Sequence, residues 1–282
     1  MNPFQKFVAE SAKVFKDGKK LPLGLKRKPR SVALRKSSNA LIFSPHPDDE
    51  CIVSALALRL LRESKWNIVN VAVTLGSKKE RRGARLHELK SACDFLGFDL
   101  IAAGLEKINL EARKKNPAQW RSAVQTIAKI LAVQKPRVIF LPHENDGHPS
   151  HVGTHFLVLD ALKRLPRGFK CFVVETEFWG QMKNPNLLVE IGADDLADLV
   201  AALSLHVGEV KRNPYHARLP AWMLDNVRRG AELVGGSGAA APDFAFGTIY
   251  CLRKWRGGKL LKVFNGGKFL SARKNPAGLF GA

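Results

Sequence analysis

Long apolar runs are scarce in this chain of 282 residues. The longest apolar stretches, such as those within 71–75 and 137–142, fall far short of the roughly 20 residues that a membrane-spanning helix needs. The N-terminus also lacks the continuous apolar core of a secretion signal, because Lys, Glu or Ser interrupts its apolar residues every two or three positions. We therefore expect no transmembrane segment and a cytoplasmic protein.

Cysteine is scarce too, and its spacing excludes two structural classes. The chain has four cysteines that stand far apart, and none of them forms a CxxC pair. This arrangement excludes a cysteine-rich zinc ribbon and a small disulfide scaffold. We expect four buried thiols: Cys51, Cys93, Cys171 and Cys251.

Acidic residues are nearly missing from the two ends of the chain, so the net charge of +21 is unevenly spread. Residues 1–40 hold eleven Lys and Arg against two acids, and residues 253–274 hold eight Lys and Arg without an acid. The region between them carries only +4 of the total. We expect one folded domain over 39–252, flanked by basic extensions at 1–38 and 253–282 that are candidates for contact with an anionic surface.

The central region alternates two kinds of apolar pattern. Short apolar runs typical of buried strands occupy 40–44, 67–75, 137–142, 169–175 and 244–253. Helical spacing of apolar residues occupies 51–63, 81–96, 118–132, 151–165, 193–206 and 221–233. This alternation predicts a three-layer, Rossmann-like α/β fold, with a mostly parallel sheet and helices on both faces.

Two polar clusters follow two of the predicted strands. The first is the heptapeptide SPHPDDE at 44–50, and the second is the decapeptide PHENDGHPSH at 142–151. Both precede a predicted helix, so both lie at the carboxyl edge of the sheet, where open α/β folds bind their ligands. Together they hold four histidines and five acids in seventeen positions.

Such a set can bind a metal ion. Two histidines and one carboxylate, with a fourth position open to water, form the ligand set of a hydrolytic zinc site. The same donors also suit ferrous iron. The residues alone leave other interpretations open, because an Asp before a helix is often a cap and a loop histidine is often solvated.

The first cluster closely resembles the PHPDDE signature of the LmbE-like, or PIG-L, family of zinc-dependent N-deacetylases. The 148–151 sequence HPSH resembles the downstream HxxH of that family. The resemblance implies that zinc is bound by His46, Asp49 and His151. It further implies that Asp48 is the general base and that His148 stabilises the oxyanion or protonates the leaving amine.

Weaker similarities extend the resemblance over about residues 38–252. An RxxEL segment at 85–89 implies that Arg85 contacts substrate, and a late AxxxH segment implies the same for His206. A solvated arginine and a structural, hydrogen-bonded histidine are the alternative interpretations. Ser150 stands where the family usually has Asp or Asn, so a carboxylate that could orient a catalytic histidine is missing there. We expect Asp146 to compensate for this loss, and we place Asp146 among the substrate-binding residues.

The resemblance implies a zinc-dependent hydrolase that removes an N-acetyl group from an amino sugar or glycoconjugate. Two alternatives remain open. Ser150 and the markedly basic segment 77–82 depart from the family pattern, which leaves room for an amide hydrolase acting on a non-sugar substrate. A non-catalytic relative would instead bind anionic partners through its basic ends, although the intact ligand set argues against it.

Overall fold

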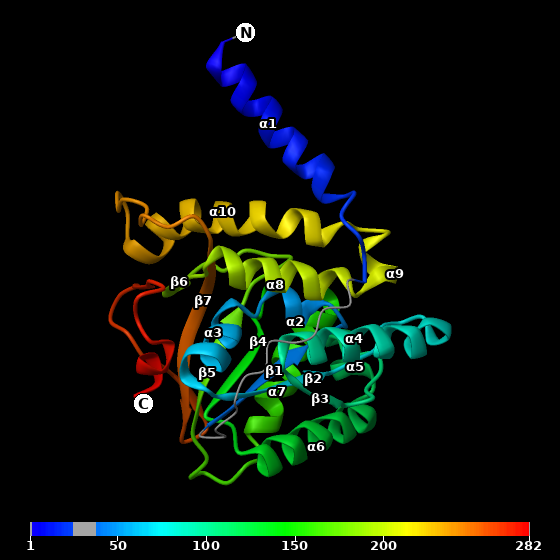
Figure 1. Cartoon of the computed structure of the whole chain (residues 1–282). Coiled ribbons are helices and arrows are strands. Elements are labelled where there is room, and N and C mark those ends of the chain that lie inside the picture. Colours follow the sequence, from blue (N-terminus) through cyan, green and yellow to red (C-terminus); the bar gives the residue numbers. More distant parts are fainter. Residues whose placement is uncertain (1, 25–37, 282) are drawn as a thin grey trace.

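The computed structural model describes residues 2–24 and 38–281, whose strands form one open, twisted sheet (Figure 1). The strand order is β3-β2-β1-β4-β5-β7-β6-β9, and β8 pairs with β7. The strands are β1 (Asn39–Ser44), β2 (Asn67–Ala72), β3 (Asp99–Ala102), β4 (Val138–Pro142), β5 (Cys171–Thr176), β6 (Leu187–Glu190), β7 (Gly247–Arg256), β8 (Lys259–Lys262) and β9 (Lys268–Leu270). The five strands from β3 to β5 are parallel, whereas β7 runs antiparallel to β5, β6 and β8.

Helices cover both faces of this sheet (Figure 1). One layer contains α2 (Asp49–Ile52), α3 (Ala55–Ser64), α4 (Arg82–Leu96), α8 (Ala193–Ser204) and α10 (Tyr215–Gly235), and the other contains α5 (Leu110–Lys115), α6 (Pro117–Gln134) and α7 (Pro149–Leu162). Along β1, Ala40 and Ile42 pack in the first layer, whereas Leu41 and Phe43 pack in the second. A strand buried on both faces has no polar side, which explains its continuous apolar sequence.

The structure confirms the predicted fold class and five of the strands. The short strands β3, β6, β8 and β9 escaped prediction, because the brief apolar runs at their positions do not stand out from loop sequence. The predicted helix at 51–63 is divided into α2 and α3 at Val53 and Ser54. The helix predicted from 221 begins earlier, at Tyr215, and continues through Pro220.

The C-terminal segment is part of the domain, which differs from the extension expected at 253–282. Strand β7 runs through that boundary, β8 and β9 join the same sheet, and Phe280 is buried. The buried Arg59 of α3 donates hydrogen bonds to the carbonyl oxygens of Ser271 and Lys274, at 3.2 and 2.9 Å. These contacts fasten the end of the chain to the first helical layer.

The cysteines and the helices agree with what the composition predicts. All four cysteines are free and buried, as predicted. No helix within 2–24 and 38–281 combines the length and apolar character needed to cross a bilayer. At the N-terminus, α1 (Pro3–Gly18) is described, whereas residues 25–37 of the predicted basic extension lie outside the described residues.

We predict that Arg59→Met lowers the free energy of unfolding by about 3 kcal/mol or more. The change leaves the carboxylate of Glu63 and three backbone carbonyls without their buried cationic donor. Denaturant unfolding measures the loss, and Arg228→Met on the exposed face of α10 is the matched control with little expected effect. Equal stability of the two variants would contradict the anchoring role of Arg59.

Candidate active site

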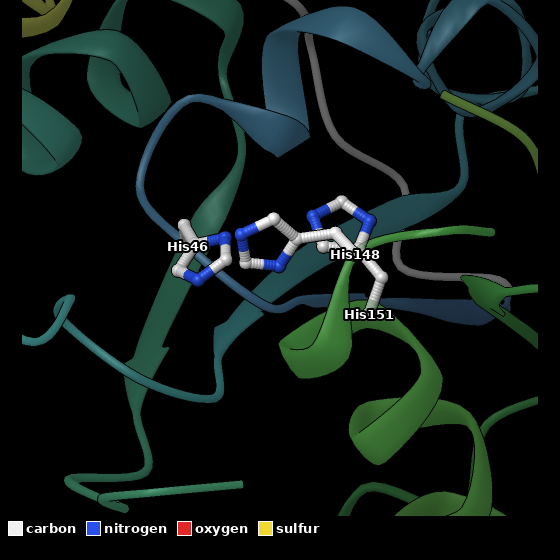
Figure 2. A group of neighbouring side chains, drawn as sticks. All are labelled: His46, His148 and His151. Atoms are coloured by element: carbon white, nitrogen blue, oxygen red, sulfur yellow. The ribbon is translucent and has the colours of Figure 1, made fainter. Parts of the chain in front are cut away.

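The candidate site lies where the sheet changes its direction of winding. Strands β1 and β4 are parallel neighbours, but the chain leaves β1 through the first helical layer and reaches β4 from the second. Such a switch point opens a crevice at the carboxyl ends of the two strands. Three histidines converge there, one from the loop after β1 and two from the start of α7 (Figure 2).

Asp49 joins two of these histidines at distances that suit one metal ion. Its Oδ2 lies 3.5 Å from His151 Nε2 and 3.7 Å from His46 Nδ1, and it accepts the His46 backbone N–H at 2.8 Å. Tetrahedral zinc with ligands about 2.0–2.2 Å away keeps those ligands roughly 3.3–3.6 Å apart. Both distances from Asp49 Oδ2 are therefore close to the separation of two ligands on one such ion.

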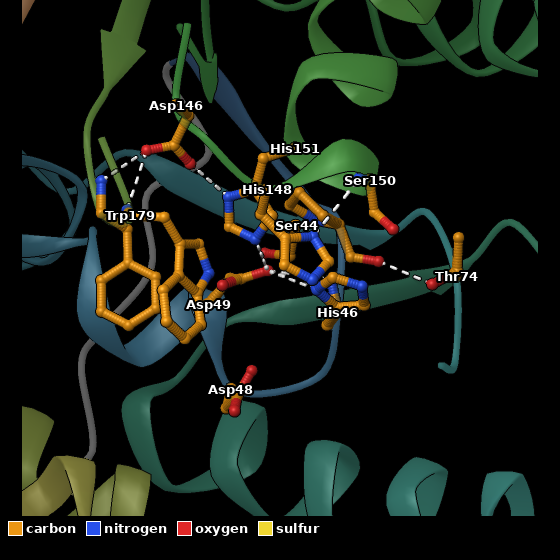
Figure 3. A network of polar contacts seen from close by, with 12 residues as sticks. Ser44, His46, Asp48, Asp49, Thr74, Asp146, His148, Ser150, His151 and Trp179 are labelled. Atoms are coloured by element: carbon orange, nitrogen blue, oxygen red, sulfur yellow. Dashed lines mark hydrogen bonds and ion pairs between the residues drawn. The ribbon is translucent and has the colours of Figure 1, made fainter. Parts of the chain in front are cut away.

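His151 is oriented by Asp146, which contacts three segments at once (Figure 3). The Asp146 Oδ2 accepts the proton of His151 Nδ1, which leaves the lone pair on Nε2. That Nε2 is buried and has no hydrogen-bond partner among the described residues. A buried nitrogen that has no hydrogen bond and faces Asp49 fits a metal ligand, and a carboxylate behind the ring is the usual support for such a ligand.

The surroundings of His151 and His46 shift the pKa values of the two imidazoles in opposite directions. Burial lowers the pKa of His151, but the carboxylates of Asp49 and Asp146 outweigh it, so the net shift is upward. Burial and the neighbouring His151 and His148 together hold the pKa of His46 well below its usual range. His46 is therefore neutral at pH 7, as a metal ligand must be.

His148 begins α7 and differs from the other two histidines in its hydrogen bonding. Its Nδ1 accepts the backbone N–H of Ser150 at 3.3 Å and so caps the helix, whose first residue is Pro149. Burial, and then His151, lower the pKa of His148. In the neutral ring with Nδ1 as acceptor, Nε2 carries the proton and can donate it in a hydrogen bond.

Asp48 occupies a strained position beside the cluster. Its φ of 115° lies in the left-handed region, which is costly for a residue with a side chain and is often found at functional sites. Burial, and then the neighbouring Asp49, raise the pKa of Asp48 well above its ordinary value, and Arg85 partly opposes this rise. A carboxylate with a raised pKa is suited to accept a proton near neutral pH.

Glu50 holds Asp48 in place and was not among the predicted site residues. It is fully buried, its Oε2 accepts the Asp48 backbone N–H at 2.9 Å, and its Oε1 lies 2.6 Å from His206 Nε2. Burial alone would raise the pKa of Glu50, but His206 and the Asp48 N–H lower it. Glu50 thus remains charged and supports the β1 loop.

This arrangement corrects two predicted substrate contacts. His206 is only 1% exposed and faces Glu50, so it positions the loop instead of meeting a substrate. Asp146 is also 1% exposed, and its oxygens are taken by His151 and by backbone N–H groups. Its predicted compensation for Ser150 agrees with the geometry, because Asp146 supplies the carboxylate that orients His151.

Arg85 lies against the β1 loop, and its contact with a substrate stays a prediction. It is half-buried on α4, and its Nη2 donates to the carbonyl oxygen of Pro47 at 2.9 Å, next to Asp48. Gly76 makes this approach possible, because its φ is 88° and a Cβ there would lie 2.4 Å from Arg85 Nη1. The guanidinium therefore lies beside the acidic pair of the β1 loop.

An aromatic loop after β5 completes the site and was missed in the sequence. Asp146 Oδ1 accepts the backbone N–H groups of Phe178, Trp179 and Gly180 at 2.9, 2.9 and 3.1 Å. The Trp179 ring is 51% exposed, and its centroid lies 5.9 Å from that of His148 (Figure 3). The signal was available, since this segment follows a predicted strand at the same edge of the sheet.

Comparisons with known proteins agree with the fold and the motifs. The family model described as PIG-L: GlcNAc-PI de-N-acetylase matches residues 41–162. This match confirms, over that segment, the resemblance to the PIG-L, or LmbE-like, family noted from the sequence. A probable N-acetyl-alpha-D-glucosaminyl L-malate deacetylase 2 of Bacillus cereus is 28% identical over 142 residues, which cover 46% of this chain and 63% of that relative.

Solved structures share the fold at lower identity. The N,N'-diacetylchitobiose deacetylase of Pyrococcus horikoshii is 17% identical with a TM-score of 0.58, over 92% of this chain and 94% of that one. The 4-carboxy-2-hydroxymuconate hydratase GalB of Pseudomonas putida is 15% identical with a TM-score of 0.59, over 76% and 95% of the two chains. Because a deacetylase and a hydratase share this fold, the reaction must be inferred from the site.

We predict that Asp146→Asn lowers divalent-metal affinity by about 10- to 100-fold and leaves the fold intact. The amide oxygen can still accept the three loop N–H groups, but the amide nitrogen would face His151 Nδ1 and move the ring proton to Nε2. Calorimetric zinc titration and thermal unfolding measure the two effects. Asp160→Asn, which alters the ion pair with Arg113 near the C-terminal end of α7, is the control, and unchanged zinc affinity in Asp146→Asn would contradict the assignment.

Proposed function

We propose that this protein is a zinc-dependent N-deacetylase that removes an acetyl group from the nitrogen of an amino sugar or glycoconjugate. The observation that carries the proposal is that Asp49 Oδ2 lies 3.7 Å from His46 Nδ1 and 3.5 Å from His151 Nε2, a buried nitrogen without a hydrogen bond. Asp48 and His148 lie on the same rim. The family description and the names of the Bacillus and Pyrococcus relatives support deacetylation of an N-acetylated sugar.

His46, Asp49 and His151 would hold the metal. Ferrous iron is the alternative to zinc, because two nitrogens and a carboxylate oxygen suit both ions. When bound, such an ion polarises the substrate carbonyl and makes water acidic enough to lose a proton near pH 7.

Asp48 and His148 then divide the proton chemistry. Asp48 accepts the proton of the attacking water, and its strained backbone holds its carboxylate near that of Asp49. The Nε2–H of His148 donates a hydrogen bond to the oxygen that becomes negative as the carbonyl carbon turns tetrahedral. When the C–N bond breaks, the proton held by Asp48 goes to the amine nitrogen, and acetate and the free amine result.

The positions of Arg85 and Trp179 support a sugar-bearing substrate. The exposed indole beside His148 offers an apolar face for a sugar ring, and Arg85 offers hydrogen-bond donors next to Asp48. The basic segment 77–82, which follows β2 at the same edge, favours an anionic group on the substrate. A non-sugar amide with such a group is the alternative that a substrate panel distinguishes.

We predict that Asp48→Asn retains one metal per chain yet hydrolyses N-acetylated sugars at least about a hundredfold more slowly, the scale of a lost general base. His46→Ala and His151→Ala instead lose stoichiometric metal, because each removes one of three ligands. Metal analysis of purified protein and amine release from a panel of N-acetylated sugars check both effects. Full metal occupancy in the alanine variants would refute the ligand assignment, and normal turnover in Asp48→Asn would refute the base.

We also predict that Trp179→Ala raises KM for N-acetylated sugars about tenfold and changes kcat little, because it removes ground-state stacking. Trp179→Phe restores most of the affinity. An N-acetylated substrate without a sugar ring is the internal control, since its KM stays unchanged. A loss of kcat in Trp179→Ala, with KM unchanged, would place the indole in the chemical step instead.

A further inference from the structure

The N-terminal helix α1 projects from the body of the protein (Figure 1). It begins with a capping box, in which the Asn2 side chain accepts the Gln5 backbone N–H at 2.8 Å and the Gln5 side chain accepts that of Asn2. None of its residues is buried. Its last turn contacts α10, where the Arg218 guanidinium lies 4.4 Å from the centre of the Phe15 ring.

One side of α1 is an exposed apolar stripe. Phe4, Phe7, Val8 and Val14 recur at helical spacing, and each is at least 65% exposed. The opposite side carries the charged residues Lys6, Glu10, Lys13, Lys16 and Asp17. A helix with this division of side chains normally buries its apolar side.

Local interactions alone do not explain why this helix is stable. An isolated helix of about 15 residues is marginal in water even with favourable propensities, so burial of its apolar side must supply most of the stability. The capping box and the ion pair between Lys6 and Glu10, at 4.0 Å on the exposed surface, contribute little. The stripe therefore calls for a partner that covers it.

The charge of the region points to an anionic membrane surface as that partner. Eight Lys and Arg and no acid follow α1 within residues 19–36, so the apolar stripe stands next to a strongly basic segment. Lysines beside an apolar helix face are typical of helices that lie in the headgroup region, where anionic lipids attract each nearby cation. A second copy of this chain would instead bring two basic segments together, and nucleic acid would leave the phenylalanines in water.

We propose that α1 is an interfacial helix that inserts Phe4, Phe7, Val8 and Val14 into the headgroup region of a bilayer containing anionic lipids. The lysines of its other face, together with the exposed Lys19 and Lys20 at its end, contact the lipid phosphates. This binding is independent of the proposed hydrolysis, because α1 contributes no residue to the candidate site. It would bring the whole enzyme to a membrane surface.

Vesicle flotation of the full chain tests the proposal. We expect binding to vesicles of phosphatidylcholine and phosphatidylglycerol, weaker binding as salt rises, and much less binding to phosphatidylcholine alone. Phe4→Ser combined with Phe7→Ser reduces the affinity for vesicles at least about tenfold, because the burial of two phenyl rings in the bilayer is lost. Val133→Ser is the matched control, since Val133 is as exposed but lies on α6.

Charge reversal separates the two parts of the interaction. Lys6→Glu combined with Lys13→Glu weakens binding to phosphatidylglycerol vesicles and reduces its dependence on salt. Thermal unfolding of each variant should match the unsubstituted protein, because all four positions are exposed. Equal vesicle binding by the double serine variant would overturn the proposal. Two other results would also overturn it. One is a dimer, seen by sedimentation, that the double serine variant dissociates while no vesicle binding is observed. The other is binding to RNA but not to vesicles that the double serine variant retains.

Discussion

The carboxylate of Asp146 is the contact on which the site depends, because it joins the loop after β4, the start of α7 and the loop after β5. Four donors meet its two oxygens: His151 Nδ1–H and three consecutive backbone N–H groups. A buried carboxylate is tolerable only when it is paired or hydrogen-bonded in this way. The close approach also needs Gly180, since a Cβ there would lie 2.6 Å from the Asn145 carbonyl oxygen. The orientation of His151 and the position of Trp179 are therefore set together.

A second buried carboxylate stabilises the other half of the site. Glu50 ties the strained Asp48 backbone to His206 at the end of α8, and it thereby offsets the cost of a left-handed conformation at a non-glycine residue. Neither Glu50 nor Asp146 meets the point where the ligands converge. Each instead holds in place a residue that the proposed mechanism uses, so the acidic residues of the two motifs divide between the proposed reaction and support.

The sequence allowed prediction of the parts of the molecule whose pattern is local. The strands β1, β2 and β4 are apolar on both faces, and the polar clusters that follow β1 and β4 meet because parallel strands end at one edge. The supporting contacts are different, because they join residues far apart in the chain. His206 meets Glu50 across 156 positions, and Asp146 meets the loop at 178–180 across more than 30. No spacing rule indicates such pairs, and for this reason both residues were predicted in the substrate site.

The position of the supporting carboxylate has a consequence for His148. The family usually has Asp or Asn at position 150, and the carboxylate of an Asp there would stand in the first turn of α7, beside the imidazole that caps this helix. It would favour the charged form of that imidazole. With Ser150 there and the carboxylate moved to the buried Asp146, burial and the nearby His151 dominate, and the pKa of His148 is lowered. The neutral ring can stabilise an oxyanion through its Nε2–H but is a poor source of a whole proton. In the proposed reaction the leaving amine therefore takes its proton from Asp48, whose raised pKa lets it first accept and then return that proton.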